Sequence, residues 1–334
     1  MLERARADGL VLELTSQFPS TTAAHTTTLN SGLPLGVHGV YEWHILEPSL
    51  DRVITPLMFS FAGDAVRETL AATGLTPDAV FPRETQHMRL TAAGVRSVCA
   101  MPASFAGSST NRALLRGAEI VPARGAADAL ARACGALASS DRIHASVYLP
   151  TFDALMHRVG PDAPAAHAEL VSLLDAVAGA LPLVPQGTLV LIGTDHGMAA
   201  ISPERTTYVN VVWPELEQHL RRGADGKPLA PAGSCRDLFL HVLPGHVDEV
   251  VSGVSERLAE VADVVETRTL LEEGAFGEEV SGAFLARLAE VVVLPRPGEA
   301  AWWLEPGRFE QTFFGQHGGR SADEVEIPLL ALVV

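Results

Sequence analysis

A threonine stands in this sequence where a helix N-terminus is expected. The run Phe18-Pro-Ser-Thr-Thr follows an apolar segment, Leu10–Leu14, that is typical of a strand. A short helix is predicted to begin near Thr22 and to end at Gly32. The Thr22 hydroxyl would then lie beside unpaired backbone N–H groups, which favour an alkoxide or a bound phosphate. The simpler alternative is that Thr21 and Thr22 only cap the helix.

A carboxylate and an imidazole follow a second predicted strand. Asp153 and His157 come after the apolar run Ile143–Leu149 and are four residues apart, so on a helix they share one face. Side chains placed in this way can hold one divalent metal ion. The alternative is an Asp that stabilises the helix dipole and an incidental His.

Three more candidate site residues, Asp195, His196 and His317, are predicted to lie in loops. Asp195 and His196 lie just past the apolar run Gly187–Gly193, which we interpret as a buried strand, and open α/β sheets bind ligands at the carboxyl ends of their strands. The Asp-His-Gly sequence is also compatible with a simple turn. His317 lies among three glycines, where the backbone can approach an ion or a phosphate closely.

The elements that must position these residues alternate between strand and helix. This alternation predicts βαβ units and a mostly parallel sheet flanked by helices, which is an α/β fold. The expected helices are 63–72, 126–138 and 162–181, and the expected strands are 94–100, 143–149, 187–193 and 329–334.

The pattern changes between residues 206 and 303. Strands are predicted at 237–243, 263–269 and 291–294, and helices at 247–261 and 281–290, after a linker rich in Gly, Pro and Ala at 221–234. We interpret this region as a small α+β insertion that covers the site. The predicted organisation is a core of residues 1–205 and 304–334 with an insertion at 206–303.

Composition limits the partners and the compartment. The 334 residues carry a net charge of −16, which argues against nucleic-acid polymers, whose binding needs Lys and Arg. Small phosphate esters remain possible ligands, because a metal ion reverses the local field. The three cysteines, Cys99, Cys134 and Cys235, are expected to be buried thiols in a reducing compartment. We expect no membrane-spanning run and no signal peptide, and therefore a cytoplasmic protein.

Together, these pieces resemble the alkaline phosphatase superfamily, and within it the nucleotide pyrophosphatase/phosphodiesterase branch. The matching motifs run from about Leu10 to the end of the chain and are weak across the insertion. They are Phe18-Pro-Ser-Thr-Thr with Thr28-Leu-Asn-Ser-Gly, Pro34 with His38-Gly39, Asp153-x-x-x-His157, Asp195-His-Gly-Met and Gln316-His-Gly-Gly, in the order of the family. Any one of these motifs is weak, whereas all of them in this order are a strong signal.

The resemblance implies a site with two divalent metal ions, usually zinc, with manganese as an alternative. Asp153, His157 and His317 would hold one ion, and Asp195 and His196 would hold the other together with the Thr22 oxygen. Thr22 would attack phosphorus and form a covalent phosphoryl-enzyme, which a metal-bound water would release.

Two departures from the family pattern concern metal and phosphate binding. The family carries another metal-binding Asp at the end of its first strand, thirty or more residues before the nucleophile, and only Asp8-Gly9 resembles it here, too close to Thr22. We therefore expect a truncated or mis-started sequence whose first strand is missing. The phosphate-binding Asn of the family is replaced by Trp43, which we predict as a substrate-binding position and which leaves the diester preference open.

The leading hypothesis is a metal-dependent hydrolase of phosphodiesters or nucleotide pyrophosphates. A phosphomonoesterase or a phosphonate hydrolase of the same superfamily is the alternative. A truncated or catalytically inactive relative that binds metal is the rival from a different class, motivated by the missing Asp. A structural α/β domain with incidental histidines ranks last, because it must explain five metal-ligating residues at strand ends or in loops.

Overall fold

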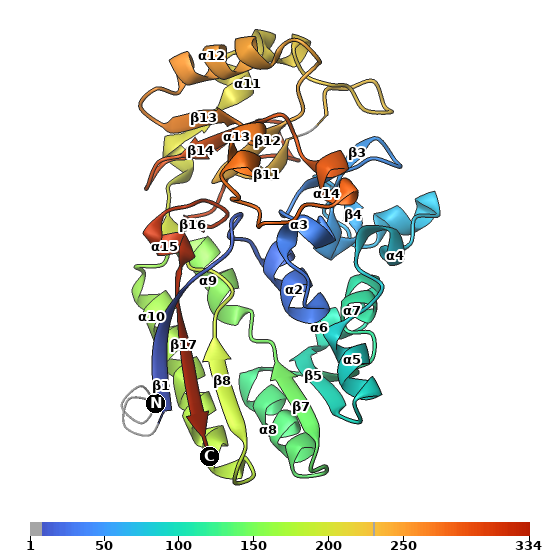
Figure 1. The fold of residues 1–334 in the computed structure, drawn as a ribbon. Coiled ribbons are helices and arrows are strands. Elements are labelled where there is room, and N and C mark those ends of the chain that lie inside the picture. The colour runs from blue at the N-terminus through green and yellow to red at the C-terminus, as the bar shows by residue number, and fades with distance from the viewer. Residues whose placement is uncertain (1–8, 230) are drawn as a thin grey trace.

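The protein is described by a computed structural model over residues 9–229 and 231–334, and it has a mixed α/β fold (Figure 1). The α/β class expected from the alternating pattern is confirmed. Asp8, the nearest match to the absent family aspartate, lies outside the described residues.

A parallel sheet forms one part of the fold. Its order is β6-β5-β7, with β6 at Glu119–Ala123, β5 at Arg96–Pro102 and β7 at Ile143–Val147. Helix α8, Ala126–Leu137, packs against all three strands. The strands expected at 94–100 and 143–149 and the helix at 126–138 are therefore confirmed to within a few residues.

A second sheet has the order β1-β17-β8, with β1 at Gly9–Thr15, β17 at Glu326–Val333 and β8 at Leu189–Gly193. Both pairings are antiparallel. The prediction that β8 is buried is wrong: Leu189 and Leu191 are 60% and 59% exposed. Exposed residues alternate with half-buried ones along β8, which is the pattern of a strand with one face toward solvent.

Three expected helices form, and the first two carry predicted site residues. They are α2 (Thr22–Ser31), α9 (Thr151–Val159) and α10 (Pro164–Ala180). Gly32 ends α2 with a φ of 69°, a left-handed conformation that costs glycine little.

One segment corrects the expectation that no apolar run reaches membrane-spanning length. Among the described residues, Pro164–Leu183 is long and apolar enough to cross a membrane by length and composition alone. Its mean hydropathy of 1.3 comes from many alanines and leucines with few charges. Core helices of soluble proteins also pass this test, and α10 packs against α8 and α9.

The helix predicted at 63–72 is wrong. This segment consists of turns and a short 3₁₀ helix, η2, at Thr69–Thr73. Gly63 and Glu68 have φ values of 81° and 68°, which a right-handed helix cannot contain. The Glu68 carboxylate instead accepts hydrogen bonds from the backbone N–H and hydroxyl of Ser109, at the start of α7 (Ser109–Leu114).

Residues 206–303 contain a four-stranded antiparallel sheet. Its order is β11-β12-β14-β13, with β11 at Ala232–Ser234, β12 at Asp237–Leu240, β14 at Val291–Pro295 and β13 at Ala262–Glu266. Helices α12 (Val247–Arg257) and α14 (Gly282–Arg287) agree with the prediction. The strand expected at 263–269 ends early at Glu266, where helix α13, Thr267–Glu272, begins.

The remaining elements are short. The helices are α3 (Leu35–His38), α4 (Pro77–Val80), α5 (Gln86–Ala92), α6 (Ala103–Ala106), α11 (Val209–Val212) and α15 (Ala322–Val325), with 3₁₀ turns η1 (Pro56–Met58), η3 (Leu181–Leu183), η4 (Pro203–Arg205) and η5 (Pro214–Gln218). The strands are β2 (Ile45–Glu47), β3 (Arg52–Thr55), β4 (Ser60–Phe61), β9 (Ala199–Ala200), β10 (Thr206–Tyr208), β15 (Ala300–Trp302) and β16 (Gly315–Gln316).

The hydrophobic core joins residues from both sides of the predicted domain boundary. Leu46 of β2 and Val53 of β3 belong to the same buried cluster as Leu238 of β12 and Val291 of β14. Residues 45–53 therefore pack with the predicted insertion, and the division at 206–303 stays a prediction.

A buried ion pair connects β12 to the C-terminal segment. The Arg236 guanidinium donates to both oxygens of Glu324, at 3.0 and 2.9 Å, and both side chains are almost fully inaccessible to solvent. The Glu324 carboxylate also accepts from the backbone N–H groups of Gly319 and Ser321. A buried pair whose remaining lone pairs are also bonded fixes its elements in one arrangement.

Two further carboxyl groups lie fully buried beside this pair. Glu42 and Asp237 interact, and burial raises the pKa of Glu42 from 4.5 to about 8 and that of Asp237 well above its usual value. Ser234 donates its hydroxyl to Asp237 Oδ1 at 2.7 Å. Because two adjacent carboxylates cannot both stay charged without water, we infer that the pair holds a proton.

This pair predicts an unusual dependence of stability on pH. The folded pKa of Glu42 lies above its unfolded value, so the folded state binds more protons and the free energy of unfolding falls between about pH 4.5 and pH 8. In Glu42→Gln, the amide replaces the protonated carboxyl, so this loss should disappear. We expect the stability of the variant, relative to that of the native protein, to rise by about 3–4 kcal/mol between pH 5 and pH 8.

Chemical denaturation across this pH range measures the effect. Glu215→Gln, at an exposed position, is the matched control and should follow the native curve. Parallel curves for Glu42→Gln and the native protein would contradict the shared proton.

Candidate active site

Thr22 lies at the start of α2 with its hydroxyl bonded to a histidine. Its Oγ1 is 2.9 Å from Nε2 of His196, a contact between residues 174 positions apart. The capping alternative fails for Thr21, because the Thr21 side chain makes no capping hydrogen bond and its buried Oγ1 has no partner. The Thr22 oxygen is thus held at a helix N-terminus and faces the predicted ligands.

Asp153, His157 and His317 converge on one point. Their ligand atoms all lie within 4.8 Å of one another, with His157 Nε2 at 3.6 Å and His317 Nε2 at 3.9 Å from the Asp153 carboxylate. The two histidines bond through Nδ1 to backbone carbonyls, of Gly315 at 2.8 Å and Ser20 at 3.0 Å. These bonds place the proton on Nδ1 and leave both Nε2 lone pairs free.

The donor set fits a divalent metal ion. Asp153 Oδ1 is buried and has no hydrogen-bond partner, which is costly unless a ligand supplies one. Burial raises the pKa of Asp153, and the His157 and His196 imidazoles oppose this shift. Burial and the neighbouring imidazoles keep the pKa of His317 well below its usual value, so this ring is neutral and able to ligate.

Asp195 and His196 follow β8 and lie beside the first group. The His196 ring stacks on the His317 ring with centroids 3.7 Å apart, and Asp195 Oδ2 is 3.5 Å from His196 Nε2. The Nδ1 atom of His196 bonds to the Gly197 carbonyl at 2.8 Å, so its Nε2 faces Thr22. All six residues predicted as nucleophile or ligands therefore come together in one place.

Ser16 and His25, which were not predicted from the sequence, support Asp195. The Ser16 hydroxyl, just after β1, contacts both His25 Nε2 at 2.6 Å and the Asp195 carbonyl at 2.7 Å. His25 Nδ1 is bonded to the Thr21 carbonyl at 2.7 Å. Both His25 nitrogens are thus used by the protein, and this residue orients the segment before Thr22. The spacing of His25 three residues after Thr22 was the only signal in the sequence.

An aromatic cavity of about 350 Å³ opens beside Thr22. Trp43, the position where the family has an Asn, lines it, as do His44 and Arg308. Other lining residues are Trp302, Phe309, Phe313, Gln311 and Gln316. The cavity offers flat apolar faces with a few polar groups at its wall, which suits a planar organic group next to a phosphoryl group.

Two further histidines, His38 and His44, do not join the site cluster. His38 is bonded through both nitrogens, to Thr28 Oγ1 and the Val40 N–H, so its role is structural. His44 bonds to Thr55 and stacks on Trp302, at the wall of the cavity. Burial lowers the pKa of each to about 3.

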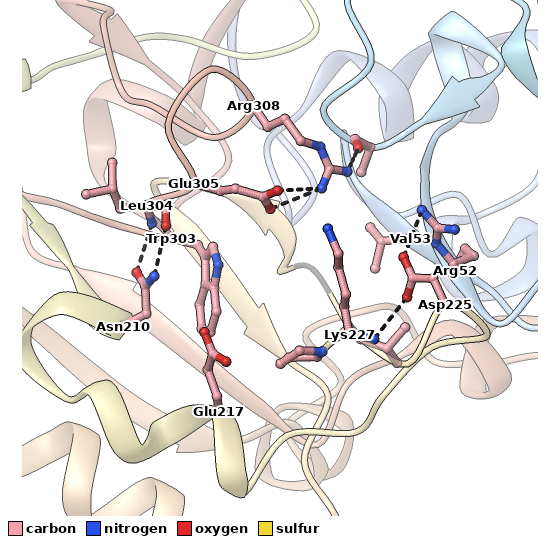
Figure 2. Close-up of a pocket in the computed structure, with 13 residues that line it drawn as sticks. Arg52, Val53, Asn210, Glu217, Asp225, Lys227, Trp303, Leu304, Glu305 and Arg308 are labelled. Carbon is pink, nitrogen blue, oxygen red and sulfur yellow. Dashed lines mark hydrogen bonds and ion pairs between the residues drawn. The ribbon is translucent and has the colours of Figure 1, made fainter.

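A second cavity of about 270 Å³ adjoins the first, with Arg308 in the wall of both (Figure 2). The Arg308 guanidinium donates to both oxygens of Glu305 and to the Ala62 carbonyl. Arg52, Lys227, Glu217 and Asp225 also line it, and Arg52 forms an ion pair with Asp225 at 3.3 Å. Three cationic and three anionic side chains balance each other, so the charges give no net preference for an anion.

Two of the glycines around His317, Gly318 and Gly319, lie against the buried carboxyl groups. A Cβ atom on Gly318 would come within 2.6 Å of Ser234 Oγ, 2.8 Å of Asp237 Oδ1 and 2.9 Å of Glu42 Oε1. The φ of 124° at Gly318 also disfavours any other residue. The loop that carries His317 is therefore pressed onto the carboxyl cluster.

This packing predicts that Gly318→Ala weakens metal binding without touching a ligand. The added methyl group must displace the loop, and with it His317, so we expect the affinity for zinc to fall at least about tenfold. Isothermal titration of the metal-free protein measures this affinity. Gly298→Ala is the matched control, because Gly298 also has a positive φ of 79° but its Cβ would meet nothing within 4 Å. Equal losses in both variants would show that backbone strain alone is responsible.

Comparisons with known proteins identify the family of this chain and structures with a similar fold. Residues 1–320 match the family model described as type I phosphodiesterase/nucleotide pyrophosphatase. The structure is similar to murine ectonucleotide pyrophosphatase/phosphodiesterase 5, with 17% identity, a TM-score of 0.68, and coverage of 99% of this chain and 82% of that one. The human protein of the same name gives 16% identity, a TM-score of 0.70, and coverage of 98% and 81%.

A bacterial structure is equally similar. Phosphonoacetate hydrolase from Sinorhizobium meliloti 1021, in complex with phosphonoformate, gives 16% identity, a TM-score of 0.68, and coverage of 100% of this chain and 84% of that one. The search of curated proteins found no match. At these identities the structural likeness establishes the fold alone, whereas the family model covers nearly the whole chain.

Proposed function

We propose that this chain, which belongs to the type I phosphodiesterase/nucleotide pyrophosphatase family, hydrolyses phosphodiesters or nucleotide pyrophosphates with Thr22 as its nucleophile. The family makes the chain a hydrolase, and the family is metal-dependent. The observation that carries the proposal is the position of Thr22 Oγ1, 2.9 Å from His196 at the start of α2.

The side chains of the site have distinct roles in this proposal. Thr22 is the attacking group, and the N-terminus of α2 favours negative charge on its oxygen and on the phosphoryl group. Nε2 of His196 bonds to the Thr22 hydroxyl, so it holds this oxygen in one orientation. The Ser16–His25 pair supports both Asp195 and the segment before Thr22.

The proposal assigns two divalent metal ions, either zinc or manganese. Asp153, His157 and His317 would hold the first, and Asp195, His196 and the Thr22 oxygen would hold the second. Bound ions of this kind lower the pKa of a coordinated hydroxyl and stabilise the charge of the transferring phosphoryl group. Asp153 Oδ1, buried without a partner, supports the first assignment.

The shape of the cavity supports an organic ester rather than inorganic pyrophosphate. Trp43, Trp302 and Phe309 present aromatic faces beside Thr22. An inactive variant of the murine relative has been solved in complex with AMP, a planar base on a phosphate. For this chain we propose a small substrate whose planar or apolar group packs against these aromatic rings.

A phosphonate hydrolase is the second candidate. The bacterial neighbour has been solved with phosphonoacetate and with phosphonoformate, both small phosphonates. Phosphonoacetate would leave most of a 350 Å³ aromatic cavity unfilled, which favours the organic ester.

Substitution of Thr22 tests the central role. In Thr22→Ala the attacking oxygen is absent, so we expect turnover of bis-p-nitrophenyl phosphate to fall at least about a thousandfold. Zinc binding at Asp153, His157 and His317 should be largely kept. Thr26→Ala is the matched control on the same helix, because the Thr26 hydroxyl bonds only to the Thr22 carbonyl.

The comparison of substrates decides between the candidates. Faster turnover of the diester than of p-nitrophenyl phosphate and phosphonoacetate is expected. Undiminished hydrolysis by Thr22→Ala would remove Thr22 as the nucleophile, and turnover of phosphonoacetate alone would favour the second candidate.

A further inference from the structure

Two histidines and a glutamate converge far from the candidate active site. His219 follows η5, His246 immediately precedes α12, and Glu249 lies in the first turn of α12. Figure 1 shows α12 at the top of the view, away from α9 and β16. We propose that these three side chains bind one divalent transition-metal ion, in addition to the ions proposed for the active site.

The distances match the geometry of a zinc site. Nδ1 of His219 is 3.0 Å from Nδ1 of His246, and Glu249 Oε2 lies 3.4 and 3.6 Å from these two atoms. Tetrahedral zinc with bonds of about 2.0–2.1 Å separates its ligand atoms by about 3.3 Å. The three distances in the structure lie on either side of this separation of about 3.3 Å. One ion could therefore contact all three atoms with little movement of the side chains.

The arrangement of lone pairs points to a cation. Two neutral imidazoles that face each other through Nδ1 can share only one proton, and a carboxylate oxygen close to both needs a donor as well. A divalent ion at the centre accepts all three lone pairs at once. Glu249 could instead only stabilise the dipole of α12. That role would not require His219 and His246 both to turn Nδ1 toward its carboxylate.

The backbone holds the two histidines in place. The N–H of Leu243 donates to the His219 carbonyl at 2.8 Å, and the N–H of His246 donates to the Leu243 carbonyl at 3.1 Å. The Trp213 ring also packs on the His219 ring, with centroids 5.2 Å apart. Gly253 lets α12 approach Trp213, because a Cβ there would come within 2.6 Å of the indole. The ligands are therefore positioned before any metal binds.

The ligand set selects the class of ion. Imidazole nitrogens with one carboxylate suit zinc, copper and nickel, whereas magnesium and calcium prefer oxygen ligands alone. The side chains of His246 and Glu249 are 40% and 60% exposed, so an ion can enter from solvent and keep a water molecule as its fourth ligand.

Equilibrium dialysis of the full chain against a fixed concentration of free zinc tests the proposal, with bound zinc measured by elemental analysis. We expect His219→Ala/His246→Ala to bind one zinc ion fewer than the native protein and to keep its hydrolytic activity. His167→Ala, which removes an exposed histidine from α10, is the matched control and should bind the native amount.

A second variant distinguishes zinc bound at the candidate active site from zinc bound at His219 and His246. His317→Ala should lose zinc from the candidate active site and retain the ion at His219 and His246. If the double variant fails to fold, His246→Gln at the half-exposed position should alone weaken binding of this ion at least about tenfold. Equal zinc binding by the native protein and by the His219 and His246 variants would overturn the proposal, whether or not the protein hydrolyses esters.

Discussion

The structure depends on one buried arrangement of charge. Arg236 and Glu324 form a fully buried ion pair, and Glu42 and Asp237 lie next to it. The loop of Gly318 and Gly319 passes so close to these carboxyl groups that a side chain at either glycine would collide with them. Because breaking a buried pair costs about 3–5 kcal/mol, this arrangement fixes β12, the C-terminal segment and the loop of His317 relative to one another. The position of His317, a proposed metal ligand, therefore depends on a buried charge cluster.

Hydrogen bonds fix the side chains around Thr22, the proposed nucleophile, in the same way. Thr22, His196 and His317 come from distant parts of the sequence, yet each is held by hydrogen bonds to backbone carbonyls or to a neighbouring side chain. The three histidines of the site place their Nδ1 protons on carbonyls and turn Nε2 inward. Such preorganisation means that metal binding needs little rearrangement of the protein.

Much of the site was predictable because its residues sit in short, ordered motifs. The helix after Thr22 and the pair on α9 follow from local spacing, and the six residues do converge. The helix expected at 63–72 failed because Glu68 adopts a left-handed conformation to cap α7, which periodicity does not reveal. The carboxyl cluster was missed since Glu42, Asp237 and Glu324 are far apart in sequence and look like ordinary surface acids. The glycines beside His317 were noted, but the groups that they approach depend on tertiary packing.

We propose that Thr22 and two metal ions act together on a phosphoric ester. The most direct test is the metal content of the purified chain by elemental analysis, measured on the same sample as hydrolysis of bis-p-nitrophenyl phosphate. We predict that chelation abolishes turnover and that zinc or manganese restores it. When His219 and His246 are replaced, we expect two ions per chain, both bound at the candidate active site. A chain that turns over the diester at full rate after complete removal of metal would contradict the account, as would a fully loaded chain without turnover.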